Sequence, residues 1–408
     1  MNSKPKTLAT KEEANPARVP KLRFPEFRAE KPWEPTTIGA LGNFYYGKSA
    51  PKWSLSEDAP TPCVRYGELY TKFGPVITET YSRTNTDPET LRFSKGGEIL
   101  IPRVGEKPED FGKCCCYLPL KDIAIGEMIS VLETKQHPLF YTYYFRHLHK
   151  QFAKVVEGQN VKNLYYVELE PLAIHRPSIP EQQKIAECLS SADELMAAQA
   201  RKVDSLKTHK KGLMQQLFPR EGETAPRLRF PEFRDAGEWE AQSLGELSES
   251  ISSGKDKAAT DGAFDLYGST GIIGKTHNRS YSGNYLLVAR VGANAGLLTK
   301  ATGEFGVTDN TLVIILKEQR STDFILYYLD QVGLNKMIFG SGQPLITGGQ
   351  LKALSLQVPK PAEQQRIASC LSSLDALVAA ETRKLEALKT HKKGLMQQLF
   401  LSLDEVEA

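Results

Sequence analysis

The sequence lacks the features of a membrane or secreted protein. None of its apolar runs approaches the roughly 20 residues that a membrane-spanning helix requires. Residues 1–20, MNSKPKTLATKEEANPARVP, contain no apolar core like that of a signal peptide and are expected to form a flexible tail. The chain is therefore predicted to be cytoplasmic and to contact no membrane.

Cysteine and histidine are too scarce and too poorly spaced for a metal centre or a disulfide scaffold. Of the six cysteines, Cys114, Cys115 and Cys116 are adjacent, an arrangement that suits neither tetrahedral coordination nor disulfide bonding. The seven histidines form no H-E-x-x-H pattern. We predict no metal site and expect reduced, mostly buried thiols, as in cytoplasmic proteins.

Motifs of nucleotide-dependent and methyl-transferring enzymes are also missing. Residues 267–276, YGSTGIIGKT, imitate the end of a phosphate-binding loop, but Ser269 stands where its first glycine belongs. A glycine-rich turn between short strands explains this stretch better. The chain contains no Pro-Pro pair, which a DNA methyltransferase would need in its [ND]-P-P-[YF] motif. The formal net charge of +3 is too small to indicate a nucleic-acid partner unless basic residues gather on one face.

What the sequence does contain is a tandem duplication. LKTHKKGLMQQLF occurs at 206–218 and again, letter for letter, at 388–400, while LRFPEFR occurs at 22–28 and again at 228–234. Thirteen identical residues cannot be a coincidence. These near-identical frames enclose segments that differ greatly, as expected for a fixed scaffold that holds two variable modules.

Each repeat ends in a long heptad pattern, which predicts helices over 179–219 and 360–400. Apolar residues recur with 4-3 spacing over about five heptads, and two matched seams in one chain most easily bury each other as an antiparallel coiled coil. The alternative is that each stripe belongs to the core of a helical bundle. The predicted seam residues are Ile185, Leu189, Met196, Val203, Leu206, Leu213 and Leu217, and Ile367, Leu371, Leu374, Val378, Leu385, Leu388, Leu395 and Leu399.

The enclosed segments are typical of mixed α/β (α+β) modules. Strands are predicted at 96–105, 128–134, 284–292 and 310–316, between Gly, Asn and Asp turns. Each module then has one aromatic helix, at 138–152 or 322–339. The duplicated order implies a pseudo-twofold axis. The predicted limits are a tail at 1–20, the first module with its arm at 21–178, the first helix at 179–219, the second module with its linking arm at 220–359, the second helix at 360–400 and a tail at 401–408.

The order of these parts resembles the specificity subunit of type I restriction–modification systems over residues 22–400. Both long helices begin near EQQ-x-IA, and YGSTGIIGKT followed by YLLVARVGANAG is similar to a target-recognition domain of that family. The first module keeps the strand end as Arg103-Val104-Gly105, but it has RYGELYTKFG at 65–74 in place of the glycine-rich turn. The two modules are therefore expected to recognise different DNA sequences.

The resemblance implies a non-catalytic subunit that reads double-stranded DNA. Each module would read one half of a split, asymmetric target, and the helices would separate the halves. The chain would hold two modification subunits, which methylate adenine with S-adenosylmethionine, and restriction subunits with translocase and nuclease activities would join them. No cofactor is expected on this chain; S-adenosylmethionine, ATP and Mg are expected on its partners.

Candidate DNA contacts are basic and amide side chains in loops or at strand ends, because phosphates attract Lys and Arg while base edges pair with Arg, Lys and Asn. For each of them the alternative is a solvated surface charge. Arg103 and Arg290 occupy matched positions, so they are alternatively structural residues that pair with a carboxylate inside the fold. The candidates are Lys48, Lys52, Arg65, Lys72, Arg83, Arg103 and Lys107 in the first module and Lys255, Lys257, Lys275, Asn278, Arg279, Arg290 and Asn294 in the second.

Two other functions are compatible with parts of the sequence. A nuclease pattern of Asp122 with Glu133-Thr134-Lys135 is loose, and the corresponding stretch of the second module, Lys317-Glu318-Gln319, has no acidic-x-lysine counterpart. A strand end before a helix explains it better. The chain is alternatively a non-catalytic coiled-coil adaptor with two ligand-binding modules, and the sequence alone leaves this alternative open.

Overall fold

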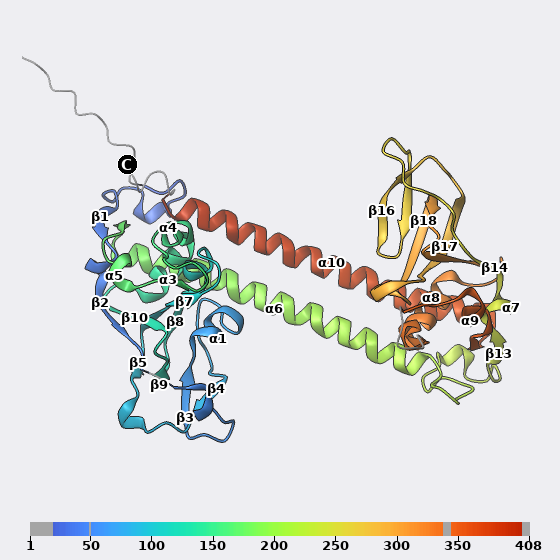
Figure 1. Ribbon diagram of the computed structural model, residues 1–408, viewed down its shortest axis with the longest axis horizontal. Helices are drawn as coiled ribbons and strands as arrows, with labels where there is room; N and C mark the ends of the chain where they lie inside the picture. Colours follow the sequence, from blue (N-terminus) through green and yellow to red (C-terminus); the bar gives the residue numbers. More distant parts are fainter. Residues whose placement is uncertain (1–18, 49, 338–343, 402–408) are drawn as a thin grey trace, which may run out of the picture. The chain divides into compact units, whose positions relative to one another are not determined.

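A computed structural model describes residues 19–48, 50–337 and 344–401, which form two compact units (Figure 1). The first unit contains the chain up to Ala198 and from Leu385 onward, and the second contains Gln199–Lys384. Each unit thus combines one module with a part of each long helix, whereas the sequence analysis had divided the chain into consecutive segments. Most of the two predicted tails, residues 1–18 and 402–408, lies outside the described residues.

Both long helices form where the heptad pattern predicts them. Helix α6 spans Ile179–Leu217 and helix α10 spans Pro361–Leu399, each with an early proline and a glutamate in the first turn. Every predicted seam residue is buried or half-buried. The seam residues that pack against the module cores are Ile185, Leu189, Leu395 and Leu399 in the first unit and Leu213, Leu217, Ile367 and Leu371 in the second.

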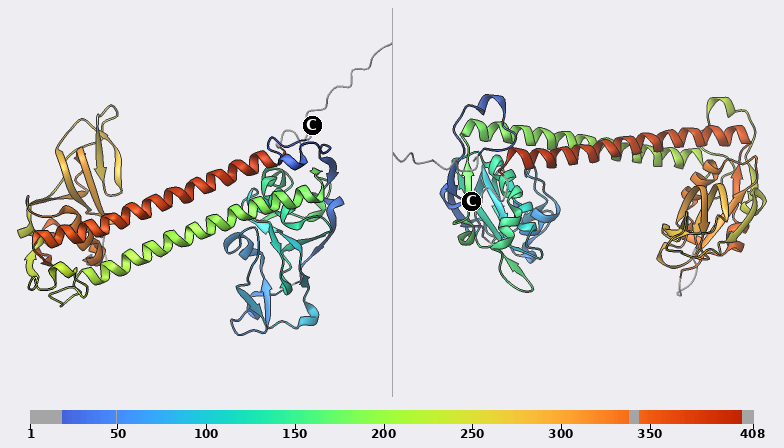
Figure 2. Two further views of the ribbon diagram at one scale, coloured as in Figure 1. Left: turned by 180° about the vertical axis from the view of Figure 1, so that it is seen from behind. Right: turned by 90° about the horizontal axis from the view of Figure 1, so that it is seen from above.

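Polar residues that interrupt the seam contact the opposite helix. In the second unit, Gln199 Nε2 donates to Glu381 Oε2 at 2.6 Å, and Lys210 Nζ lies 2.6 Å from Asp375 Oδ1. Residue numbers rise along α6 as they fall along α10, so the two helices, which lie side by side in Figures 1 and 2, are antiparallel. The predicted antiparallel pair is confirmed.

The first module contains two four-stranded sheets. Its strands are β1 (Glu34–Thr37), β2 (Gly42–Tyr46), β3 (Thr61–Val64), β4 (Ser82–Thr84), β5 (Phe93–Lys95), β6 (Glu98–Pro102), β7 (Val104–Gly105), β8 (Cys116–Leu118), β9 (Lys121–Ile125), β10 (Ile129–Thr134), β11 (Lys162–Asn163) and β12 (Ala173–Arg176). The orders are β2-β10-β6-β8, all antiparallel, and β4-β3-β9-β5, in which β3 and β9 are parallel. Its helices are α1 (Tyr66–Thr71), α2 (Asp110–Lys113), α3 (Pro138–His147), α4 (His149–Lys154) and α5 (Tyr166–Leu169).

The second module is built around one six-stranded sheet. Its strands are β13 (Glu240–Ser243), β14 (Ser248–Ser253), β15 (Phe264–Gly268), β16 (Gly271–Thr276), β17 (Tyr281–Ala289), β18 (Leu298–Val307), β19 (Thr311–Leu316) and β20 (Ser355–Val358). The order is β14-β19-β17-β18-β15-β16, and only β15 and β18 pair in parallel among these described strands. Its helices are α7 (Leu244–Leu247), α8 (Thr322–Val332) and α9 (Gly348–Ala353). The four strands predicted in the two modules are present as β6, β10, β17 and β19.

One of the predicted aromatic helices is divided in two, and the other is shorter than predicted. The first is divided at Leu148 into α3 and α4. The second, α8, ends at Gly333, whose φ of 72° is the left-handed conformation in which glycine commonly ends a helix. Residues 338–339 of that prediction lie outside the described residues.

Each long helix ends in the core of the other repeat's module. Phe400, which follows α10, stacks on Tyr144 of the first module with ring centroids 5.1 Å apart, and Phe218, which follows α6, lies 4.9 Å from the Tyr328 ring of the second. All four rings are at most about 5% exposed. Leu401, which was assigned to a C-terminal tail, is fully buried in the first core, so the ordered core extends one residue further than predicted.

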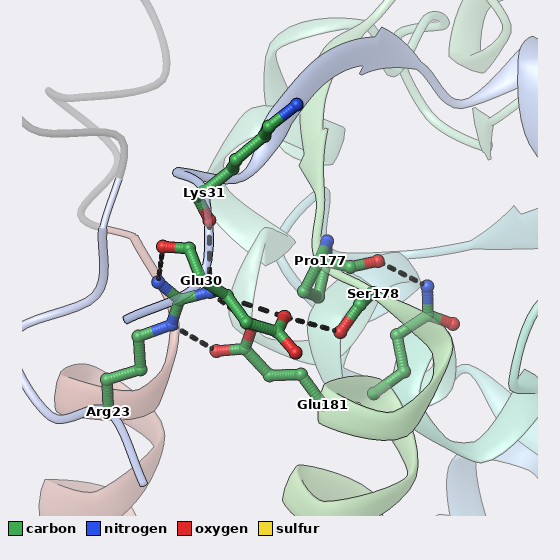
Figure 3. A network of polar contacts seen from close by, with 7 residues as sticks. Arg23, Glu30, Lys31, Pro177, Ser178 and Glu181 are labelled. Carbon is green, nitrogen blue, oxygen red and sulfur yellow. Dashed lines mark hydrogen bonds and ion pairs between the residues drawn. The ribbon is translucent and has the colours of Figure 1, made fainter. Parts of the chain in front are cut away.

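A buried ion pair joins the arm of each repeat to its long helix; Figure 3 shows that of the first repeat. Arg23 donates from Nε and Nη2 to Glu181 at 2.9 and 2.8 Å, and Glu181 is only 1% exposed. In the second unit, Arg229 holds Glu363 through two bonds of 2.7 Å. A charge buried this deeply needs a partner of opposite charge. The arginine of LRFPEFR and the first glutamate of EQQ-x-IA are such partners, and both motifs are present in each repeat.

Candidate nucleic-acid interface

Two candidate residues of the first module meet at one edge of its β2-β10-β6-β8 sheet. Strands β2 and β6 flank β10 and run opposite to it, so both end where β10 begins. There Gly47 N donates to Ile129 O at 3.0 Å, and Arg103 N donates to Met128 O at 2.9 Å. Lys48 and Arg103 therefore leave the sheet on either side of the start of β10.

The second module repeats this arrangement. Gly254 N donates to Thr311 O at 3.1 Å, and Arg290 N donates to Asn310 O at 2.9 Å, at the start of β19. Lys255 follows Gly254 as Lys48 follows Gly47. We call Lys48 with Arg103, and Lys255 with Arg290, the basic edge of each module.

The glycine before each edge lysine packs closely against the backbone of a neighbouring segment. A Cβ at Gly47 would lie 2.2 Å from the carbonyl oxygen of Gly126, and a Cβ at Gly254 would lie 2.1 Å from that of Val307. Only glycine fits at either position. Lys48 and Lys255 are predicted from the sequence as separate DNA contacts, and their correspondence emerges only from the structure. The signal in the sequence is the spacing of the two Gly-Lys pairs, 207 residues, which almost equals that of the duplicated arms.

Neither edge arginine pairs with a carboxylate. The Arg103 guanidinium lies 4.9 Å from the Tyr46 ring and 5.6 Å from the Tyr165 ring, a favourable position for a cation. Its Nε, like that of Arg290, is buried without a hydrogen-bond partner, and neither guanidinium has an ion pair with any described residue. The alternative of a structural ion pair inside the fold is therefore wrong in the described part of the chain.

A family model agrees with this architecture. The model described as "Type I restriction modification DNA specificity domain" matches residues 30–208 and 236–390, most of the chain, in two copies. The chain belongs to this family of specificity subunits. Such subunits are the non-catalytic, DNA-recognising components of restriction–modification complexes, which agrees with the lack of catalytic motifs in the sequence.

Two curated relatives match this specificity subunit over most of its length. The chain is 23% identical to the type I restriction enzyme MjaVIII specificity subunit of Methanocaldococcus jannaschii, with 93% of both chains covered. It is 24% identical to the putative MjaX specificity subunit of the same organism, over 74% of this chain and 77% of the relative. A match to the EcoprrI specificity subunit of Escherichia coli is 30% identical but covers 30% of that relative.

Solved structures share the fold. The crystal structure of the type I restriction–modification S subunit from M. genitalium has a TM-score of 0.62 at 16% identity, and the match covers 94% of this chain and all of the other. A chain from a structural study of complex assembly and conformational transition in the type I R-M system has a TM-score of 0.57 at 14% identity, over 90% and 97%.

Several candidate DNA contacts of this specificity subunit are already engaged within the fold. Arg83 donates to the backbone carbonyls of Ala59 and Pro60, and the Lys72 ammonium lies 5.7 Å from the Tyr81 ring. In the second module, three candidates bind acidic side chains at 2.8–2.9 Å. These three are Lys275 with Asp265, Arg279 with Glu304, and Asn278 with Asp256.

Other candidates have no such side-chain contact with a described residue. Arg65 is half-buried at the start of α1, and Asn294 is exposed at the end of a 3-10 helix, Gly292–Asn294. The exposed lysines without an ion pair to any described residue are Lys48, Lys52, Lys107, Lys255 and Lys257. Exposed apolar side chains beside these loops are not predicted from the sequence, notably Trp53, which is 82% exposed next to Lys52. No periodic pattern in a loop distinguishes an exposed apolar side chain from a buried one.

The stretch YGSTGIIGKT forms a β-hairpin. Strands β15 and β16 pair across it, Gly271 adopts a φ of 99° at the turn, and Lys275 lies within β16. A phosphate-binding loop would lead from Lys275 into a helix. The prediction of a glycine-rich turn between short strands is confirmed, and Ile272 and Ile273 are at least half-exposed on it.

The cysteines are unpaired thiols with raised pKa values, and the described residues include no candidate metal site. All six cysteines are free thiols, and burial raises the pKa of Cys116 to about 12 and that of Cys63 to about 11. Within the ranges that the structure describes, no cluster of His, Cys, Asp and Glu could hold a metal ion, and no helix is long and apolar enough to cross a lipid bilayer.

Proposed function

We propose that this chain reads a bipartite, asymmetric target on double-stranded DNA, one half with each module. The observation that carries the proposal is that the two modules share a basic edge and the same aromatic contacts to the long helices, while their other sheets and loops differ. A shared edge and attachment let both modules approach DNA in the same way, and different loops provide different base contacts.

The differences between the modules support an asymmetric target. Between β15 and β16 the second module has a tight hairpin, whereas between β3 and β4 the first has helix α1 and exposed Tyr66 and Tyr81. The sheets that carry these elements also differ, with two sheets of four strands in one module and six strands in the other. Elements of such different shape would read different base sequences.

We also propose that the chain is a scaffold for two modification subunits and for restriction subunits. The long helices, whose sequences nearly repeat, would give the modification subunits two equivalent docking surfaces. S-adenosylmethionine, ATP and Mg would be bound by these partners and none of them by this chain. The proposed location is the cytoplasm, where such a complex meets DNA.

Sequencing of methylated DNA tests the reading role. The chain is co-expressed with its modification subunits, and the methylated motif is compared with that of a chimaera in which residues 242–359 come from another such subunit. The proposal expects one half of the motif to change and the other half to stay the same. A change in both halves would contradict independent reading. The absence of any sequence-specific methylation or binding would favour the alternative, a coiled-coil adaptor with two ligand-binding modules.

A further inference from the structure

We infer that the basic edge of each module binds the phosphate backbone of DNA, and that base reading belongs to the loops that differ between the modules. The inference rests on the proposed function, because it takes DNA as the ligand. It assigns separate roles to residues that the sequence could only group together as basic. The duplication provides an internal comparison, because each feature of one module can be matched with the other module.

The matched residues cannot distinguish different sequences. Lys48 and Lys255 follow equivalent strands, as do Arg103 and Arg290, and the same two backbone hydrogen bonds fix each pair. If the two modules read different half-sites, a feature that is the same in both must contact what the half-sites share. The phosphate backbone is that shared part, because phosphate contacts position a protein on DNA without carrying sequence information.

The edge is also rigid enough to serve as a fixed clamp. The backbone of each edge arginine is held on both sides, since its amide donates to the central strand and its carbonyl accepts a bond of 2.9 Å from Leu164 N in the first module or Ile346 N in the second. The glycine before each edge lysine permits no side chain. An edge fixed in this way and bound to phosphates would keep the variable loops at a constant distance from the bases.

The chemistry of the edge favours an anionic ligand from outside the module. Both edge arginines are half-buried at the same place, and neither guanidinium forms an ion pair with a described residue. The lysine on the other side of the central strand from each arginine is exposed and has no ion pair with any described residue. A phosphodiester fits such a pair, because guanidinium groups bind phosphate oxygens strongly and lysine adds a point charge.

An acidic protein surface is the competing ligand, and the location of the edge argues against it. A partner subunit that docks twice on this chain would be expected to use the near-identical arms and long helices. The basic edge instead lies on the modules, beside loops that differ. DNA is the ligand that both modules must share.

Salt-dependent binding of the complex with its modification subunits tests the inference. Affinity for a duplex with the methylated motif and for a scrambled duplex is measured by fluorescence anisotropy over a series of salt concentrations. Lys48→Ala is expected to weaken binding to both duplexes by the same factor and to lower the slope of log affinity against log salt by about 0.9, the value for one phosphate contact. Lys255→Ala should act in the same way, and Lys48→Arg should restore the slope.

Matched controls are available at the opposite edge of the same sheets. Lys135 follows β10 and Lys317 follows β19; both are exposed and neither has an ion pair with a described residue. Lys135→Ala and Lys317→Ala remove the same charge, and they should leave affinity, slope and motif unchanged. Arg103→Ala is a second test of the edge, with circular dichroism to verify that the module folds without the contact to Tyr46.

The other outcomes overturn the inference in distinct ways. A changed methylation motif in Lys48→Ala would make the edge a base-reading element. Normal DNA binding by preassembled complex, with loss of assembly, would make it a protein-docking surface. Unchanged binding and assembly in both lysine variants would leave the edge without a role in either. If the unaltered complex itself failed to prefer its motif, the proposed function would fail first.

Discussion

A fragment that ends at Phe218 should form a homodimer. A fragment of residues 1–218 lacks segment 388–400, which packs on the first module in the complete chain. The fragment keeps the identical segment 206–218 but lacks the second module on which that segment packs. Because both segments have the same thirteen residues, 206–218 of one copy should fit the vacant site on another. In a dimer with a twofold axis, each copy would place its segment 206–218 on the first module of the other copy.

The contacts to be replaced are specific. In the complete chain, Phe400 stacks on Tyr144 and Lys392 Nζ lies 2.5 Å from Asp193 Oδ1. In the fragment, Phe218 and Lys210 of the second copy would take these two places. Asp193 also accepts a hydrogen bond of 2.7 Å from Tyr143, so the acceptor is held in position before the lysine arrives.

The Phe218→Ala variant of the fragment gives the prediction a magnitude. Truncating a buried phenylalanine costs about 3–5 kcal/mol, and a symmetric dimer contains the contact twice, so the variant should lose about 6–10 kcal/mol. A dissociation constant of about 1 µM corresponds to about 8 kcal/mol. A dimer of micromolar affinity would therefore become a monomer.

Sedimentation equilibrium of the fragment and its variants checks the reasoning. The fragment should be dimeric at micromolar concentration, Phe218→Ala should be monomeric, and Leu195→Ala, which truncates a side chain that is 54% exposed on the same helix, should remain dimeric. A stable monomer of the unaltered fragment, or a dimer that survives Phe218→Ala, would refute the exchange of helix ends.

Three further predictions follow from single contacts. Lys275→Ala should leave ATP binding undetectable, as in the unaltered chain, because this lysine lies in a hairpin; saturable ATP binding in calorimetry that the variant abolishes would contradict the hairpin interpretation. Arg23→Ala should lower the free energy of unfolding by about 3–5 kcal/mol, because it leaves the buried Glu181 unpaired; a thermal melt equal to that of Lys135→Ala would count against this. Four residues inserted after both Gln199 and Glu381, which contact each other, add about 6 Å of helix and should lengthen the unread spacer by one or two base pairs without changing either half-site; methylation sequencing that finds the same spacer would rule out the helices as a ruler.

The local structure was largely predictable because its signals are local. Heptad spacing identified α6 and α10, and short strand-like runs between turn residues identified β6, β10, β17 and β19. The division of the first aromatic helix at Leu148 had no comparable signal. Gly333 did offer one, since glycine often ends a helix, but the predicted helix continued past it.

The pairing of distant segments could not be predicted from periodicity. The heptad seam places Leu217 and Leu399 on the inner face of a helix, but it does not say whether that face meets the other helix or a module. The destination of Phe400 depends on the Tyr144 ring, more than 250 residues earlier in the chain. The same limit applies to Arg103 and Arg290, since no pattern within a strand end indicates whether a carboxylate comes near in space.

The contacts between frame and module explain how so much of a module can vary. Tyr143 of the first module and Tyr327 of the second each donate to an aspartate of their own long helix, at 2.7 and 2.6 Å, and a lysine from the opposite helix binds the same aspartate. With the stacked Phe and Tyr rings, these few aromatic side chains of α3 and α8 form much of what the frame requires of a module. A change elsewhere, as between helix α1 and the β15–β16 hairpin, leaves those contacts intact. The frame can therefore remain almost constant while the loops that would face DNA differ.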